Sequence, residues 1–263
     1  MSKYGDILVS IFSEKQDPDN PSAEIPFTRD DLVGHAMRLG IEPPKNLGDI
    51  VYSFRYRSTM PDEIAASALV GHTWIIVGTG DAKYSFIMSK QSNINPNPDL
   101  LPILVPNNTP EMLSLYSLSD EQSLLAKIRY NRILDLFLGI VTYSMQNHLR
   151  TKVEGIGQIE IDELYIGVNK AGQQFIIPVQ AKTGNDRIGV VQLYQDISYC
   201  KAVFPDLICL PIAVHYVDEE VCMFQLALDH WAVGIIEERH YKLVQSSAIN
   251  DEYVRKTNIS REP

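Results

Sequence analysis

The chain has 263 residues, a hydrophobic fraction of 45% and a net charge of −10 at pH 7, which suits one large globular domain or two small ones. No stretch approaches the roughly 20 apolar residues of a membrane span, and the first residues lack the basic and apolar regions of a signal peptide. The three cysteines form no CxxC pair, so we expect neither a zinc site nor a disulfide framework, as suits a reducing cytoplasm.

Residues 1–27 are predicted to form an N-terminal extension. A short apolar segment, Ile7–Phe12, is followed by a polar stretch that ends in the turn-forming residues Asp17–Pro21.

Residues 28–90 are predicted to form a small unit of their own. Thr28 is typical of a helix cap, and Gly40 would end that first helix. A second helix is expected at Lys45–Arg57. Two β-prone runs, Thr73–Val77 and Lys83–Met88, surround a glycine turn and predict a hairpin.

Two helices followed by a β-hairpin resemble a winged helix-turn-helix module. In that arrangement the second helix would carry Lys45, Ser53, Arg55 and Arg57 to a DNA groove. A small α+β domain that binds protein, or nothing, would show the same pattern, because basic and acidic residues balance in this segment.

Residues 91–110 are dense in asparagine and proline, which indicates a linker or an extended connector. Its apolar part, Leu100–Val105, is expected to pack against a domain.

Residues 111–263 are predicted to form a second domain, an α/β (α+β) core with a mixed sheet. A capping box at Ser119–Gln122 would begin a long helix that ends near Gly139. The later elements are expected as three strands, a helix and two strands, at His148–Val153, Gln158–Val168, Gln174–Lys182, Asp186–Ala202, Leu207–Tyr216 and Val221–Leu228.

A local basic patch lies in this domain although the whole chain is acidic. The negative total argues against loose, non-specific DNA binding but not against local basic contacts. A solvated helix face would give the same pattern. The patch has five basic residues and one acid: Lys127, Arg129, Arg132, Arg150, Lys152 and Asp135.

The two central predicted strands bring polar side chains together. In the first strand Glu160 and Asp162 share a face, opposite Ile161 and Glu163. A turn at Asn169–Gly172 should fold the next strand back, so that Gln180 and Lys182 end beside Asp162. A carboxylate, a second oxygen ligand and a backbone carbonyl suit Mg²⁺, and a lysine there can stabilise negative charge. A surface ion pair is the alternative.

Asp162, a hairpin and Gln180-Ala-Lys182 resemble the Asp…(Asp/Glu)-x-Lys signature of the PD-(D/E)xK nucleases. The resemblance implies that Asp162 and Gln180 are metal ligands, that Ala181 offers its carbonyl, and that Lys182 is the catalytic lysine. Gln180 replaces the usual acid with a neutral oxygen, which should weaken metal binding unless another acid helps. Glu160, on the same strand face, is the expected helper.

Many members of that family place a further acid on a helix before the core strands. Glu121 and Asp135 both lie on the predicted helix, about 21 Å apart along its axis, so at most one can reach the metal. We favour Asp135, because an acid that interrupts an apolar run is costly without a partner. A structural ion pair of Asp135 with Arg132 is the alternative.

The wider pattern is similar to a group of prokaryotic type II restriction endonucleases with an N-terminal winged-helix module. That similarity implies a cytoplasmic, Mg²⁺-dependent homodimer that cuts double-stranded DNA at specific sites. Solvent-facing polarity is the alternative explanation for the implied DNA contacts. The similar segments are 146–150, 157–167 and 178–182, and the implied contacts are Gln146, Asn147, His148 and Arg150 together with Gln192 and Gln195 of a Gln-xxx-Tyr pattern.

Two other functions remain open from the sequence. One is a repair, nicking or junction-resolving nuclease. The other is a winged-helix DNA-binding regulator with an inactive nuclease-like domain, which Gln180 in place of an acid would favour.

Overall fold

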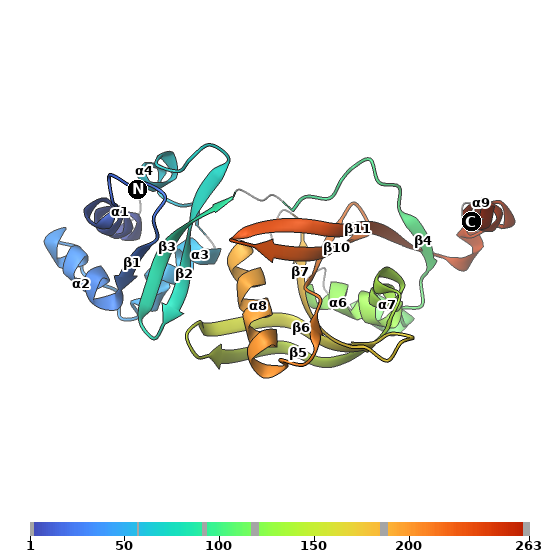
Figure 1. The fold of residues 1–263 in the computed structure, drawn as a ribbon. Helices are drawn as coiled ribbons and strands as arrows, with labels where there is room; N and C mark the ends of the chain where they lie inside the picture. Colours follow the sequence, from blue (N-terminus) through green and yellow to red (C-terminus); the bar gives the residue numbers. More distant parts are fainter. Residues whose placement is uncertain (1–2, 57, 91–93, 117–120, 185–188, 260–263) are drawn as a thin grey trace.

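The computed structural model describes residues 3–56, 58–90, 94–116, 121–184 and 189–259 (Figure 1). The chain has a mixed α/β fold, with a three-stranded sheet in its N-terminal part and an eight-stranded sheet in its C-terminal part. Within the described ranges, no helix is long and apolar enough to cross a membrane.

The N-terminal unit packs four helices against a small antiparallel sheet of order β1-β3-β2. The predicted cap is confirmed, because Thr28 Oγ1 accepts a hydrogen bond from the Asp31 N–H at 3.3 Å. The predicted hairpin is also present. The elements are α1 Lys3–Lys15, β1 Ile25–Thr28, α2 Arg29–Arg38, α3 Gly48–Tyr56, α4 Asp62–Ala66, β2 His72–Gly80 and β3 Lys83–Lys90.

Residues 3–27 are part of this unit, contrary to the predicted extension. Ile7, Leu8 and Ile11 of α1 are fully buried, and β1 pairs with β3. The Phe12 ring stacks edge-on against Trp74, with 5.1 Å between the ring centroids. The apolar positions recur at the helical spacing of three to four residues, so the short apolar run is the buried stripe of a longer helix.

The C-terminal unit is built on a mixed sheet of order β4-β11-β10-β9-β7-β6-β5, and β8 also pairs with β7. Strand β7 runs parallel to β9, and β4 runs parallel to β11. The mixed sheet is therefore confirmed. Its elements are β4 Ile103–Pro106, α5 Glu111–Tyr116, α6 Glu121–Tyr130, α7 Ile133–Leu138, β5 Val141–Val153, β6 Gly157–Val168, β7 Gln174–Thr183, α8 Val190–Val203, β8 Ile208–Cys209, β9 Ile212–Val217, β10 Glu220–Asp229, β11 Ala232–Val244, a 3-10 turn Ser246–Ala248 and α9 Asp251–Ile259.

Helices cover both faces of this sheet because its central strand is apolar on both sides. In β7, Ile177 packs with residues of α6 and α7, whereas Ile176 packs with Tyr199 and Cys200 of α8. Successive residues of a strand face opposite sides, so a continuous apolar run such as Phe175–Val179 is buried in two layers.

Three features differ from the sequence predictions. The long helix breaks into α6 and α7 at Arg132, whose φ is +55°, and Asn131 at the break binds the Lys127 carbonyl and Thr109 Oγ1. Part of the predicted linker is β4, which pairs with β11. Neither β11 nor α9 was predicted. Two predicted boundaries, the capping-box residue Ser119 and the helix start Asp186, lie outside the described residues.

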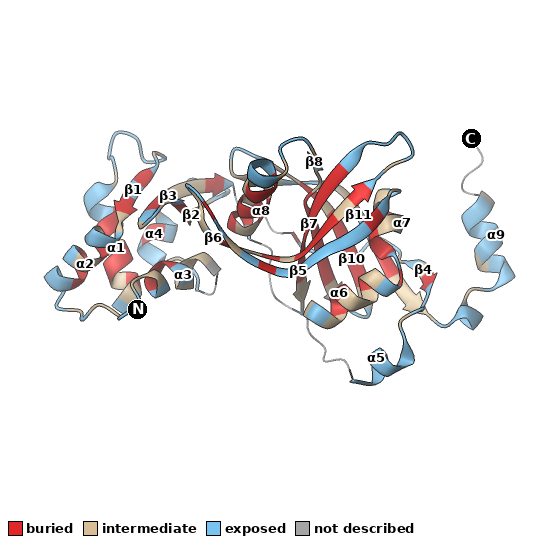
Figure 2. Cartoon of the chain, turned by 90° about the horizontal axis from the view of Figure 1, so that it is seen from below, coloured by how far each residue is buried: buried red, intermediate tan, exposed pale blue. Residues whose placement is uncertain are grey.

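The two units contact each other through the β2–β3 hairpin. Val77 packs against Val190 and Val191 of α8. Ser89 Oγ donates to the Trp231 carbonyl at 2.6 Å. The tip of the β5–β6 hairpin lies against β2, since a Cβ added to Gly78 would stand 2.5 Å from the Ile156 carbonyl oxygen. Figure 2 shows β5 largely exposed along its length.

Candidate functional site

The polar residues of the predicted site lie where β6 and β7 separate. The last residues paired between these strands are Glu163 and Val179, and β6 then continues in a hairpin with β5 alone. Asp162 is the next residue along β6. Its Oδ2 accepts a hydrogen bond from the Ala181 N–H at 2.8 Å, so the Asp162 carboxylate lies against the end of β7.

Asp162 is held in surroundings that disfavour its negative charge. Burial raises the pKa of its carboxyl group, and the neighbouring carboxylates of Glu121 and Glu160 raise it further. The Ala181 N–H and the Lys182 ammonium oppose this rise but do not cancel it. A bound cation would therefore stabilise the ionised form of Asp162.

Gln180 is buried and bound to an acid of helix α8. Its Nε2 donates to both carboxylate oxygens of Asp196, at 3.0 and 3.2 Å, and to the Glu160 carbonyl at 3.0 Å. A backbone carbonyl only accepts, so this contact sets the orientation of the amide. Gln180 Oε1 is buried and, among the described residues, has no hydrogen-bond partner.

Asp196 is buried, and burial raises the pKa of its carboxyl group well above the ordinary value. The hydrogen bond from Gln180 lowers this pKa, whereas the nearby Asp162 carboxylate raises it further. The sequence analysis passed over this residue. An acid among Val191, Leu193 and Tyr199, all buried, was the signal that could have identified it, because a buried carboxyl group needs a partner.

Lys182 reaches helix α6 and meets Glu121. Its Nζ lies 3.2 Å from Glu121 Oε1, and the Lys182 side chain is 13% exposed against 37% for Glu121. Glu121 therefore joins the cluster of Asp162, Gln180, Lys182 and Asp196. The sequence analysis had placed Glu121 on the same predicted helix as Asp135 and had favoured Asp135.

Asp135, which the sequence analysis favoured as a metal ligand, does not join this cluster. Its Oδ1 accepts from the N–H and the hydroxyl of Thr142, and its Oδ2 pairs with Arg132. Thr142 is paired with Gly167, which lies five residues from Asp162 along β6. The backbones of Gly167 and Asp162 are therefore about 17 Å apart. The helix break at Arg132 turns Asp135 toward β5, so the ion pair with Arg132 is the arrangement observed.

Glu160 is near Asp162 but its carboxylate is turned to β5. Its Oε1 lies 3.0 Å from Arg150 Nη2 and 3.4 Å from His148 Nε2. The predicted strand alternation also fails beside Asp162. Ile161 packs on the α8 side, whereas Glu163 pairs with Arg129 of α6 at 3.0 Å. The interruption coincides with His148, whose φ is +53° and which lies between the paired residues Asn147 and Leu149 of β5.

The basic patch predicted at 127–152 is largely paired with acids. Arg129 pairs with the buried Glu163 and also donates to Asn147 at 3.2 Å. Arg129 and Arg132 line a pocket of about 210 Å³. Lys152 Nζ lies 2.6 Å from Asp81 in the turn between β2 and β3. The positive charge that the segment 127–152 could offer to DNA is therefore smaller than its count of basic residues indicates.

The predicted DNA contacts on β5 are exposed along the edge strand of the sheet. Gln146, Asn147, His148 and Arg150 are all exposed, and Arg150 has 58% of its side chain in solvent. The Glu160 hydrogen bond raises the pKa of Arg150 most, and Tyr52 raises it further. The row therefore forms an accessible polar edge.

The other predicted contacts differ in accessibility. Gln195 is buried and its Nε2 donates to the Gln158 carbonyl at 3.1 Å, so it supports β6 and is not open to DNA. Gln192 is partly exposed and accepts from the Gly189 N–H at 3.4 Å. Lys45 is exposed just before α3, and Arg55 is partly buried in α3. Arg57 lies outside the described residues.

Oxygen donors therefore gather at the point where β6 and β7 separate, with one lysine beside them. The carboxylates of Asp162 and Glu121 and the amide oxygen of Gln180 are the groups here that suit a hard divalent cation. The chain matches no protein-family model, and comparisons with curated proteins and with solved structures likewise found no match.

Proposed function

We propose that this chain is a Mg²⁺-dependent DNA endonuclease of the PD-(D/E)xK type. The observation that carries the proposal is the meeting of Asp162, Lys182 and Glu121 with the Gln180–Asp196 pair at the divergence of two sheet strands. The sequence resemblance suggested Asp162, Gln180 and Lys182, and the two other acids come from helices α6 and α8.

The donors proposed here are of the kind that magnesium prefers. The Gln180 Oε1 atom supports this best: it is buried and has no hydrogen-bond partner among the described residues, and such an atom is costly. Asp162, Glu121 and Gln180 would hold the ion, with the Ala181 carbonyl as a further donor. When bound, Mg²⁺ supplies charge stabilisation at the phosphate and lowers the pKa of a bound water.

The remaining chemistry belongs to the side chains. Lys182, positioned by Glu121, places a positive charge beside Asp162, where it stabilises the negative charge that develops on a phosphate during hydrolysis. Asp196 fixes the Gln180 amide nitrogen through two contacts, so that the amide oxygen is kept as the group for the metal.

The exposed edge of β5 supports the proposal of a DNA-binding surface. Asparagine and glutamine side chains can read adenine, and arginine can read guanine or contact phosphate. The Arg150–Glu160 pair is exposed, and solvent weakens exposed ion pairs, so phosphate can replace Glu160 as the partner of Arg150.

The N-terminal unit supports a winged-helix proposal. Its order of helix, strand, two helices and hairpin, with a short further helix α4 before the hairpin, is compatible with a module that places α3 in a DNA groove. Cutting both strands at one site needs two catalytic centres, so we include a homodimer in the proposal.

The test is DNA cleavage by the purified chain with Mg²⁺ or with EDTA. Lys182→Ala should lower the cleavage rate by about 10²–10³-fold or more, and Lys170→Ala is the matched control, because Lys170 is exposed in the turn between β6 and β7. Several DNAs, unmethylated and methylated, are needed, because the preferred substrate is unknown.

Discrete fragments that require both Mg²⁺ and Lys182 would support a site-specific endonuclease. Nicked or branched DNA as the preferred substrate would instead identify a repair, nicking or junction-resolving enzyme. Binding without cleavage of every DNA tested would overturn the proposal in favour of a DNA-binding regulator.

A further inference from the structure

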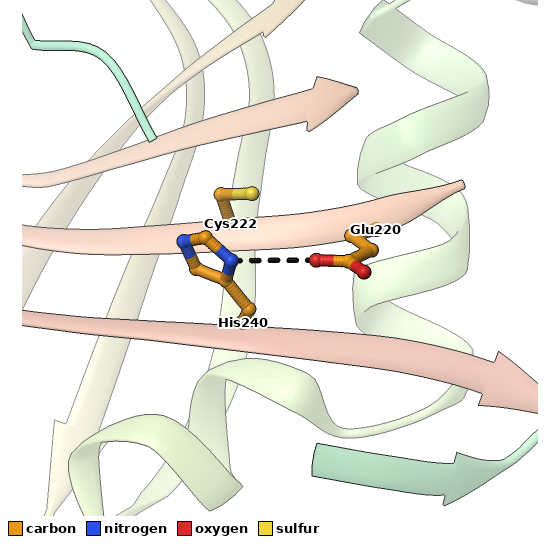
Figure 3. Close-up of side chains that lie close together, drawn as sticks. All are labelled: Glu220, Cys222 and His240. Carbon is orange, nitrogen blue, oxygen red and sulfur yellow. Dashed lines mark ion pairs between the residues drawn. The ribbon is translucent and has the colours of Figure 1, made fainter. Parts of the chain in front are cut away.

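A second group of metal-ligating side chains lies on β10 and β11, away from the Asp162 cluster. Cys222 and His240 are directly opposite in the antiparallel register, and Glu220 lies two residues before Cys222, on the same face of β10. One ligand atom from each of the three side chains lies within 4.8 Å of the others. Figure 3 shows the three side chains close together across the two strands.

His240 is held as metal-bound histidines commonly are. Its Nε2 lies 2.9 Å from Glu238 Oε1, and its Nδ1 lies 3.3 Å from Glu220 Oε2. The Asn97 N–H also donates to Glu238 Oε1, at 2.7 Å, which fixes that carboxylate. A carboxylate on one ring nitrogen orients the imidazole and leaves the other nitrogen for a metal.

The cluster carries more negative than positive charge. Among the described residues, neither Glu220 nor Glu238 makes an ion pair with a lysine or arginine. Lys242, opposite Glu220 in the register, has its Nζ 3.4 Å from Glu219 instead. The Glu220 and Glu238 side chains are 24% and 14% exposed, and the neighbouring Cys222 is 1% exposed, so these carboxylates lie in a largely buried place.

We propose that Glu220, Cys222 and His240 form a binding site for a zinc-class divalent cation. Zinc takes thiolate, imidazole and carboxylate ligands in tetrahedral sites, and a mixed sulfur, nitrogen and oxygen set favours it over magnesium. The site joins two neighbouring strands, so metal binding stabilises the β10–β11 hairpin. Sequence spacing gave no sign of it, because the ligands come from two strands and contain no CxxC or HxxxH pattern.

This site is distinct from the cluster proposed for magnesium. Lys182 pairs with His215, and His215 pairs with Cys222, so two strand spacings, about 10 Å, separate the Lys182 and Cys222 backbones. The inference therefore does not depend on nuclease activity.

The test is a titration of the full-length chain, freed of metal with a chelator, with Co²⁺ as a spectroscopic probe and Zn²⁺ as a competitor. One equivalent of Co²⁺ should give the near-ultraviolet absorption of a thiolate–cobalt bond, and Zn²⁺ should abolish it. Cys222→Ser should lose this band. Cys209→Ser is the matched control and should keep it, since Cys209 lies on β8.

Glu238→Gln should weaken Zn²⁺ binding by about 10–100-fold while leaving the ligands intact. Asp162→Asn should leave the band unchanged, which separates this site from the nuclease centre. The inference is overturned if the folded wild-type chain, checked by circular dichroism, gives no band, or if the band persists in Cys222→Ser or disappears in Cys209→Ser.

Discussion

Replacing Gln180 with glutamate, which would restore the usual acid of the nuclease motif, is expected to destabilise this chain. The Gln180 Nε2 atom donates to the Asp196 carboxylate and to the Glu160 carbonyl, each at 3.0 Å at the shortest contact. Glutamate has no N–H to donate. The Glu160 carbonyl would lose its donor, and two carboxyl groups would face each other where Gln180 is now 3% exposed.

The size of the effect follows from these contacts. A buried acceptor left without a donor costs about 1–3 kcal/mol. Two buried carboxyl groups at hydrogen-bond distance cannot both ionise, so they must retain a shared proton. We expect a total loss of about 2–4 kcal/mol in the free energy of unfolding. For a chain of this size that is a fall of roughly 4–16 °C in Tm.

The assay is urea unfolding at pH 5 and pH 8 in EDTA. Gln174→Glu is the matched control, because Gln174 is exposed at the start of the same strand, and it should change stability by no more than about 0.5 kcal/mol. The Gln180→Glu defect should grow toward pH 8 as the shared proton becomes harder to keep. Adding Asp196→Asn should recover part of the loss. Equal stability of the two glutamate variants at both pH values would refute the reasoning.

Three further predictions concern stability. Burial holds the pKa of Asp196 well above its ordinary value of about 3.9, so above about pH 4 the folded state binds more protons than the unfolded state, and the free energy of unfolding falls as the pH rises toward the folded pKa. Asp196→Asn should remove this pH dependence, which urea unfolding curves from pH 4 to 8 would detect. An unchanged pH dependence in the variant would contradict the prediction. Ile11→Ala should cost about 2–5 kcal/mol in urea unfolding, since Ile11 is fully buried in the N-terminal unit, and a loss under 0.5 kcal/mol would mean that α1 is dispensable. Gly78→Ala should cost about 1–3 kcal/mol and loosen the contact between the units, because its Cβ would meet the Ile156 carbonyl. Gly34→Ala has open space around the new Cβ and should instead stabilise α2 by up to about 1 kcal/mol. Limited proteolysis and urea unfolding would compare the two variants, and equal effects on stability would argue against the close contact at Gly78.

Local patterns predicted much of the polar centre of the sheet. The turn at Asn169–Gly172 and the apolar run of β7 predicted the hairpin that brings Asp162 to the end of β7, and that hairpin is present. These features depend on residues close in sequence, where strand alternation and turn chemistry act directly. The same rules failed at His148, where a positive φ interrupts the alternation.

Contacts between residues far apart in the sequence could be identified only from the structure. The sequence predicted that Glu121 and Asp135 lie on one long helix. The backbone turn at Arg132 divides that helix, and of the two acids it is Glu121 that reaches Lys182. Asp196 became a partner of Gln180 only when α8 packed across β7.

The sequence by itself determined the hairpin and the residue types that it presents, because hydrogen-bonding capacity and strand period are local properties. The tertiary structure alone decided which acids surround Gln180 and Lys182, and that Glu220, Cys222 and His240 meet on two strands. Burial of the apolar faces sets how helices and strands pack, and the side chains that this packing brings together are remote in sequence.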